Sequence, residues 1–186
     1  MPTGQDELKE RAKRALGKQA KYGEDIDLEK YQEGARDIPI SNLDELPDDV
    51  QNALLGSGVI PSGEGREGSL VVMDNSVISR DTVSEGFELM DTREALKKHS
   101  WLKEYSWKAV HVDADKYTAA TYLGDSPGYF IHALPGQKIR LPIQTCLMVG
   151  HNRTAQTIHN IIVVEEGASL EVVTGCTCLL YTSPSP

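Results

Sequence analysis

Apolar and polar residues follow helical spacing in the first part of the chain. Residues 5–20 are good helix formers, with acidic residues first and basic residues last, the order that the helix dipole favours. A second, short helix is expected between Pro47 and Gly56, and Ser41 or Asn42 is positioned to cap another short helix before it. The apolar stripe of the first helix is thin and comprises Leu8, Ala12, Leu16 and Ala20.

The middle of the chain combines a loop, a strand pair and a longer helical segment. Residues 57–69 are rich in glycine and serine and predict a loop. Residues 69–79 alternate like two strands joined by a turn at Asp74 and Asn75. Residues 92–110 carry the strongest helical pattern, and their two tryptophans are expected to pack in the core.

From about residue 117 the chain reads as short β-rich runs broken by glycine or proline, and two of these runs form a repeat. The segments IHALPGQKIRL and IVVEEGASLEV superimpose, 31 residues apart, when Gly136 is aligned with Gly167. Such units either stack on one another in a β-helix or lie on two sides of a small cupin-like barrel. Two copies of the unit are too few to distinguish between these two folds. The aligned apolar pairs are Ile131/Ile162, Ala133/Val164, Ile139/Leu170 and Leu141/Val172.

Composition narrows the class of protein. The chain has 19 basic and 28 acidic residues and a net charge of −9, which argues against nucleic-acid binding. No run of residues is apolar enough for a membrane span, and the polar N-terminus does not resemble a secretory signal. A cytoplasmic protein with three reduced cysteines is therefore expected. No phosphate-binding loop is present, so the chain is not expected to hydrolyse ATP itself.

Several motifs in the same order resemble one known family. The strings GYFIHALPGQKIRLPIQTCL and QTIHNIIVVEEGASLEVVTGC resemble the core of the SufB/SufD family, the iron–sulfur cluster assembly scaffolds of the SUF system. The upstream strings YQEGARDIPISNLDELPDDV and WLKEYSWKAVHVDADKYTAA resemble its archaeal-type SufB members. The resemblance is collinear from about Leu28 to Thr177.

The resemblance implies an α+β fold with two regions that differ in secondary structure. Residues 1–110 would form a mainly helical region with a small β element, and residues 111–177 would begin a right-handed parallel β-helix. Residues 178–186 resemble translated adapter sequence and are expected to be a non-native tail, with a genuine flexible tail as the alternative.

The resemblance also implies partners and cargo. A family member is an assembly scaffold rather than an enzyme, and it works with the ATPase subunit SufC and with a SufB/SufD paralogue or a second copy of itself. Sulfur would come from a cysteine desulfurase or a sulfur carrier, and the cargo would be a transient iron–sulfur cluster whose ligands lie mostly further along the family chain. Involvement of a flavin is left open. No nucleic acid and no membrane are implied.

Cys176 is the candidate sulfur acceptor, because it matches the cysteine of the family's Gly-Cys-Thr motif. A thiolate is needed to attack a persulfide, and Gly175 is expected to let the donor's backbone approach. The competing interpretation is a buried, reduced cysteine that acts as a small apolar residue. That interpretation is favoured for Cys146, which lies in an apolar run. The spacing of Cys176 and Cys178 suggests a metal clip, but two further ligands are missing.

His159 and Gln156 are weak candidates for metal ligands, since both lie in a polar segment before an apolar strand. Stacked amide side chains that bond one another are an equally good interpretation of this segment. Two other functions stay open. One is a SufD-type structural partner in the same complex, and the other is a cupin-like metal-binding barrel that uses His132, His151 and His159.

Overall fold

A computed structural model describes residues 4–31 and 43–179. The predicted cap at Ser41 or Asn42 lies outside the described residues. Short 3-10 turns lie at Leu28–Lys30, Leu43–Glu45 and Ser100–Glu104. The α-helices are α1 (Gly4–Ala15), α2 (Asp48–Gly56), α3 (Thr92–Lys98) and α4 (Lys116–Leu123). The strands are β1 (Gly68–Met73), β2 (Ser76–Thr82), β3 (Phe87–Asp91), β4 (Tyr129–Ala133), β5 (Ile143–Val149), β6 (Ile161–Val164) and β7 (Val172–Cys178).

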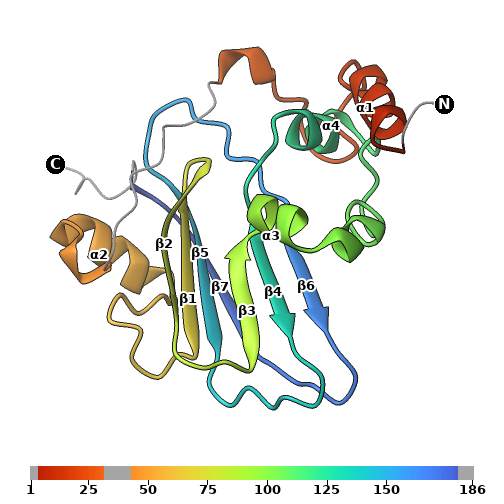
Figure 1. The fold of residues 1–186 in the computed structure, drawn as a ribbon. Coiled ribbons are helices and arrows are strands. Elements are labelled where there is room, and N and C mark those ends of the chain that lie inside the picture. Colours follow the sequence, from red (N-terminus) through yellow and green to blue (C-terminus); the bar gives the residue numbers. More distant parts are fainter. Residues whose placement is uncertain (1–3, 32–42, 180–186) are drawn as a thin grey trace, which may run out of the picture.

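The strands form two sheets that lie face to face (Figure 1). One sheet has the order β2-β1-β5-β7, and the other has the order β3-β4-β6. The pairs β1–β2 and β3–β4 are antiparallel, whereas β1–β5, β5–β7 and β4–β6 are parallel. Apolar side chains from both sheets fill the space between them, among them Leu70, Ile143, Leu89 and Ile131. The predicted α+β class and the strand pair at residues 69–79 are confirmed.

The first halves of the two repeat copies pair with each other in the predicted register. Ile131 pairs with Ile162 and Ala133 pairs with Val164 in the parallel β4–β6 ladder. Gly136 and Gly167 both adopt a left-handed φ of about 70°, which suits glycine, and their turns lie directly over one another. Each copy then leaves one sheet and enters the other, from β4 to β5 and from β6 to β7.

The second halves of the repeat do not keep this register. The bridge between Lys138 and Ser169 still has the 31-residue offset, but Val172 pairs with Ile143 instead of Leu141. The first copy is two residues longer here, and Pro142, which has no N–H to donate to a ladder, lies just before β5. The extra residues leave the sheet, so Leu141 is 44% exposed. The predicted inward pairing of Leu141 is wrong for this reason.

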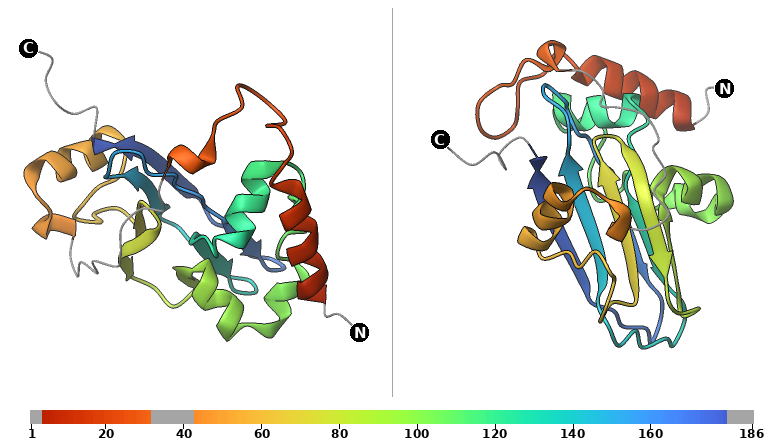
Figure 2. Two further views of the ribbon diagram at one scale, coloured as in Figure 1. Left: turned by 90° about the horizontal axis from the view of Figure 1, so that it is seen from above. Right: turned by 90° about the vertical axis from the view of Figure 1, so that its left-hand side faces the viewer.

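The helices cover different sides of the sheets. Figure 2 shows α2 against the outer face of the β2-β1-β5-β7 sheet and α1 packed beside α4 at one end of the molecule. The residues at 117–123, predicted to be β-rich, form α4 instead, because the Asp115 carboxylate accepts bonds from the Tyr117 and Thr118 amides and caps a helix. Helix α1 ends at Ala15, whereas the sequence predicts that this helix continues to residue 20.

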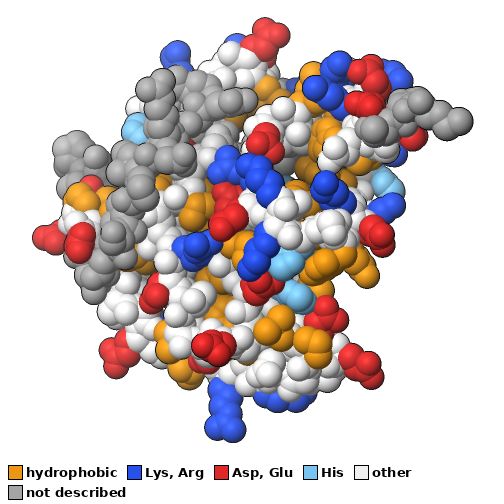
Figure 3. Space-filling view, in the orientation of Figure 1, with side chains coloured by type: hydrophobic (Ala, Val, Ile, Leu, Met, Phe, Trp, Pro, Cys, Tyr) orange, Lys and Arg blue, Asp and Glu red, His pale blue; other side chains and the backbone are white. Residues whose placement is uncertain are grey.

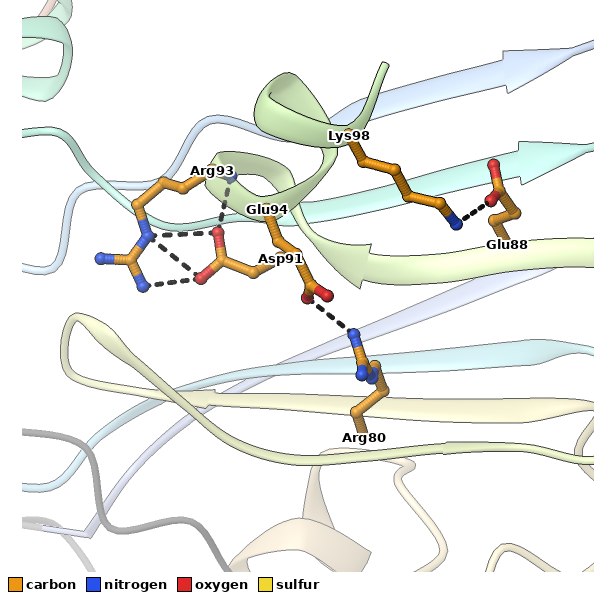
Figure 4. A network of polar contacts seen from close by, with 6 residues as sticks. All are labelled: Arg80, Glu88, Asp91, Arg93, Glu94 and Lys98. Atoms are coloured by element: carbon orange, nitrogen blue, oxygen red, sulfur yellow. Dashed lines mark hydrogen bonds and ion pairs between the residues drawn. The ribbon is translucent and has the colours of Figure 1, made fainter.

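The predicted long helix at 92–110 is broken after Lys98 and continues as a 3-10 turn. Ion pairs hold α3 on the strands beneath it, as Figure 4 shows. Glu94 contacts Arg80 of β2 at 2.8 Å, and Lys98 contacts Glu88 of β3 at 2.5 Å. The space-filling view shows basic and acidic side chains next to one another across this face (Figure 3). Within the described residues, no helix has the length and apolar character needed to cross a bilayer.

Candidate functional site

Strand β7 positions the candidate cysteine. Cys176 pairs with Leu147 of β5, and its neighbour Gly175 pairs with Cys146. Side chains alternate along a strand, so Cys146 and Gly175 face α2, while Thr174 and Cys176 belong to the face toward the second sheet. On that inner face, the Thr174 hydroxyl lies 2.9 Å from the Thr145 hydroxyl and 3.3 Å from the Tyr129 hydroxyl of β4.

Gly175 is required by the close approach of this chain's own backbone. A Cβ at this position would lie 2.7 Å from the Ser57 carbonyl oxygen and 2.8 Å from its Oγ. Ser57 ends α2, where its amide donates to carbonyls of the last turn and its hydroxyl donates to the Leu54 carbonyl. The sequence predicts that Gly175 leaves space for the backbone of a sulfur donor. In the structure the end of α2 occupies that space, and the glycine allows α2 to pack closely against β7.

Cys176 is exposed and borders a cavity of about 470 Å³. Helix α2 forms one wall of the cavity, and the end of β7 forms the other. The lining residues are Asp49, Asn52, Ala53, Gly56, Ser57, Cys176 and Thr177. Nothing in the sequence signalled this wall, because residues 49–57 precede β7 by more than a hundred positions and read only as a helix and its stop. The arrangement offers an accessible thiol at a fixed position on the edge strand, and the α2 side of the same residue borders a space that can receive another group.

Cys146 lies in the opposite environment, although it is only one strand away. It is fully buried in the cluster that α2 forms with β1 and β5. Burial raises the pKa of its thiol to about 11, and the Ser57 hydroxyl, 3.9 Å away, offsets only part of this rise. The predicted core role of Cys146 is confirmed. Cys178 is partly exposed at the end of β7, and Leu179, the next residue of the predicted tail, packs against the cluster beneath α2. Residues 180–186 lie outside the described residues.

The two weak metal candidates lie in separate surroundings. Gln156 donates from Nε2 to the Asp74 carbonyl at 2.6 Å and to the Met148 carbonyl at 3.0 Å, and so fixes the loop before β6. His159 stacks on Trp107 with ring centroids 4.2 Å apart. Burial lowers the pKa of His159 to about 4, so the ring is neutral at physiological pH. The geometry gives Gln156 a structural role and does not bring the two side chains to one ion.

The other two histidines of the predicted barrel site, His132 and His151, each bond a carboxylate. His151 Nδ1 lies 2.5 Å from the buried carboxylate of Asp74, a contact that the sequence analysis missed because it read Asp74 only as a turn residue. His132 lies between Glu88 and Glu165 on the outer face of β4. Among residues 4–31 and 43–179, no group of three or more His, Cys, Asp or Glu side chains is placed to hold a metal ion. The three histidines of the predicted barrel site therefore do not converge.

Comparison with known proteins identifies relatives over most of the chain. The iron–sulfur cluster assembly SufBD family protein of Methanothermobacter thermautotrophicus strain Delta H is 45% identical over 177 residues, which cover 92% of this chain and 43% of the relative. A protein of the same name from Archaeoglobus fulgidus is 36% identical over 112 residues, which cover 60% of this chain and 30% of the relative.

A bacterial relative is more distant. The iron–sulfur cluster assembly protein SufB of Bacillus subtilis is 28% identical over 149 residues, which cover 76% of this chain and 32% of the relative. No family model matches the chain. The chain spans less than half the length of these curated relatives. Over the residues that it shares with them, the chain belongs to the iron–sulfur cluster assembly SufBD family.

Proposed function

We propose that this chain is part of an assembly scaffold for iron–sulfur clusters and that Cys176 accepts the sulfur. The observation that carries the proposal is the exposed thiol on the edge strand β7, at a residue that also borders the cavity beside α2. Cys146 is a poor alternative because its thiol is buried and stays protonated at neutral pH. The role of the chain is to receive and hold sulfur for a cluster that is cargo, and it is not that of an enzyme.

The proposed step is an exchange between sulfur atoms. The Cys176 thiolate attacks the outer sulfur of a persulfide on the donor, and a new sulfur–sulfur bond forms on Cys176. The bond between the two donor sulfurs breaks, and the donor leaves as a thiolate. No net oxidation or reduction occurs, and no further reactant is needed. The cavity beside Cys176 would receive the persulfide-bearing segment of the donor, a cysteine desulfurase or a sulfur carrier.

The same proposal covers the architecture and the partners. The parallel β4–β6 and β5–β7 ladders, with their stacked glycine turns, support the start of a right-handed parallel β-helix that begins near residue 111. We propose that the complete protein works in the cytoplasm with the ATPase SufC and with a SufB/SufD paralogue or a second copy. The family name of the relatives supports this assignment.

Single-turnover sulfur transfer tests the proposed acceptor. The chain is mixed with a cysteine desulfurase and radiolabelled cysteine, and the label bound to the chain is followed over time. We expect Cys176→Ser to bind less than a tenth of the label that the unmodified chain binds. Cys146→Ser and Cys178→Ser should bind as much as the unmodified chain, because Cys176 is the cysteine that is both exposed and at the border of the cavity. Equal labelling of Cys176→Ser and the unmodified chain would contradict the proposal.

A second variant tests the cavity without changing the thiol. Asn52→Trp places a large side chain in the wall of the cavity and leaves Cys176 intact. We expect slower sulfur transfer from the protein donor but an unchanged reaction with a small alkylating reagent. If both reactions kept the rates of the unmodified chain, the cavity would have no part in receiving the donor.

A further inference from the structure

His132 is a buried histidine that the proposed sulfur transfer does not use. It lies on the outer face of β4, and 8% of its surface is exposed. In the sheet it pairs with Glu88 of β3 on one side and with Val163 of β6 on the other. Glu165 follows Val163 by two positions, so its side chain returns to the same face of the sheet. His132 therefore has a carboxylate on each side, one from β3 and one from the end of β6.

Both ring nitrogens of His132 lie within hydrogen-bond distance of a carboxylate oxygen. Nδ1 is 3.2 Å from Glu88 Oε2, and Nε2 is 3.0 Å from Glu165 Oε1. A neutral imidazole carries one N–H, and an ionised carboxylate only accepts hydrogen bonds. With a single proton on the ring, one nitrogen lone pair would face a carboxylate oxygen and repel it. One further proton is needed to satisfy both contacts.

The surroundings of Glu88 place the further proton on the Glu165 side of the ring. Burial opposes the ionisation of Glu88, but hydrogen bonds from Lys98 and His132 outweigh burial and lower its pKa. Figure 4 shows the contact with Lys98, whose Nζ lies 2.5 Å from Glu88 Oε1. Glu88 is therefore ionised and accepts a hydrogen bond from Nδ1–H. The further proton lies between His132 Nε2 and Glu165 Oε1, and it belongs to the ring, because an imidazole keeps a proton to a pH about two units higher than a carboxylate does.

The other groups that face His132 act on this proton in both directions. The ring centroid of Trp101 lies 5.3 Å from that of His132, and an aromatic ring near a cation stabilises its charge. A positive charge on His99 would oppose the proton, since the two histidine ring centroids are 6.3 Å apart. His99 Nε2 lies 2.9 Å from Glu88 Oε2 but is not aligned for a hydrogen bond. The side chain of Glu165 is 40% exposed, so the proton can exchange with solvent.

We propose that His132 and Glu165 form a proton-dependent clasp between the two copies of the repeat. While the further proton is bound, His132 holds the end of β6 against β4. When the pH rises and the proton leaves, a nitrogen lone pair faces the Glu165 carboxylate, and the end of β6 loosens. This end leads through the turn at Gly167 to β7, the strand that carries Cys176. The clasp does not depend on whether Cys176 accepts sulfur.

The protonation of His132 is measured directly in the 186-residue chain. Nitrogen-15 NMR of the ring, recorded from pH 5.5 to pH 9, distinguishes the doubly protonated ring from each neutral tautomer. We expect both nitrogens to be protonated at the acid end, and Nε2 to lose its proton as the pH rises while Nδ1 keeps its own. In Glu165→Gln the doubly protonated fraction at pH 7 should fall at least about threefold, because the carboxylate that stabilises the charged ring is gone. An equal fraction in Glu165→Gln and the unmodified chain would overturn the proposal.

Hydrogen exchange shows whether loss of the proton opens the clasp. The Glu165 amide donates to the Ala133 carbonyl at 3.1 Å, so its exchange reports how firmly the end of β6 is held. After correction for the intrinsic effect of pH, we expect its opening constant to rise about tenfold from pH 6 to pH 8.5, as for the loss of a hydrogen bond to a charged group. In Glu165→Gln the change should be less than about twofold, because an amide can donate to the neutral ring nitrogen. An opening constant that does not change with pH in the unmodified chain would contradict the clasp.

Glu166→Gln is the matched control for both measurements. It removes the same charge one position further along the chain, and Glu166 is exposed and forms no hydrogen bond or ion pair with His132 within the part of the chain that the structure describes. We expect this variant to keep the doubly protonated fraction and the tenfold rise of the unmodified chain. If Glu166→Gln changed either quantity as much as Glu165→Gln does, the effect would come from the net charge of the turn, and the proposal would be wrong.

Discussion

Cys146 and Cys176 lie on neighbouring strands of one sheet but in opposite environments. Cys146 is on β5, between two other strands and beneath α2, and it is fully buried. Cys176 is on β7, at the edge of the described sheet, and it is exposed. The pairing of Cys146 with Gly175 shows that the two thiols differ by one step along the strand and so belong to opposite faces.

This difference shows that strand position and the covering helix determine the chemistry available to each thiol. A cysteine under α2 is a core residue with a raised pKa, whereas a cysteine one step further, on the edge strand, is accessible to a reactant. Gly175 separates the two environments, because its missing side chain lets Ser57 and the end of α2 pack against β7.

The largest expected difference is the rate of alkylation. Cys176 should react with iodoacetamide at pH 8 at least about a hundredfold faster than Cys146, because a thiol with a pKa of about 11 is almost entirely protonated and Cys146 is also buried. Peptide mass spectrometry over a time course measures both rates in one sample. Rates within a few fold of each other would show that α2 does not protect Cys146.

Gly175→Ala should loosen the boundary between the two environments. The new methyl group would meet the Ser57 carbonyl at 2.7 Å, so α2 must shift, at a cost of about 1–3 kcal/mol in the free energy of unfolding. Urea unfolding measures this loss, and alkylation of Cys146 should become faster in the same variant. Gly56→Ala is the control, because a Cβ there has open space around it. If Gly175→Ala were as stable as that control, the close packing of α2 on β7 would be wrong.

Serine substitutions at the two cysteines should change the free energy of unfolding by different amounts. Cys146→Ser buries a hydroxyl in an apolar cluster and should lower the free energy of unfolding by about 1–3 kcal/mol. Cys176→Ser changes an exposed side chain and should stay within about 0.5 kcal/mol. Chemical unfolding of both variants checks this order. Equal losses would place both thiols in the same environment.

The smallest effect concerns the second sheet, at Glu88 of β3. Burial opposes its ionisation, but hydrogen bonds from Lys98 and His132 outweigh burial and lower its pKa below 4.5. Its contribution to stability is therefore complete above pH 4.5 and is lost as the pH falls through the lower value of the folded state. Glu88→Gln should cost about 0.5–1 kcal/mol at pH 7 and flatten the acid dependence of stability.

Unfolding curves from pH 3 to pH 7 measure the effect of Glu88→Gln. The ratio of the two alkylation rates should not change in this variant, because Glu88 lies on the other sheet. If the free energy of unfolding of the unmodified chain increased as the pH fell below 4.5, the pKa of Glu88 would not be lowered in the folded state.

Local pattern and the repeat were enough to predict part of the fold. The turn at Asp74 and Asn75 and the in-register pair Ile131 and Ile162 follow from alternation and from the aligned glycines. The slip at Leu141 was not predictable from spacing, since it depends on how two extra residues before β5 leave the sheet. The capped helix α4 was missed because its apolar residues also fit a strand, and only Asp115 signals its start.

The candidate site was predictable only at the cysteine itself. Cys176 was selected from the strand end and the family resemblance, and Cys146 was assigned to the core from its apolar neighbours. The wall of the cavity was not found, because the contact of Ser57 with Gly175 joins residues far apart in the sequence. Contacts of this kind depend on how α2 docks on the sheet, which no local pattern encodes.

Locating the transferred sulfur in the unmodified chain shows whether Cys176 is the acceptor. The chain is incubated with a cysteine desulfurase and cysteine, and each cysteine-containing peptide is examined by mass spectrometry for the added mass of one sulfur atom. We expect the persulfide on Cys176, and we expect Cys146 to stay unmodified until the chain is unfolded. A persulfide on Cys146 in the folded chain, or on Cys178 in preference to Cys176, would contradict this assignment.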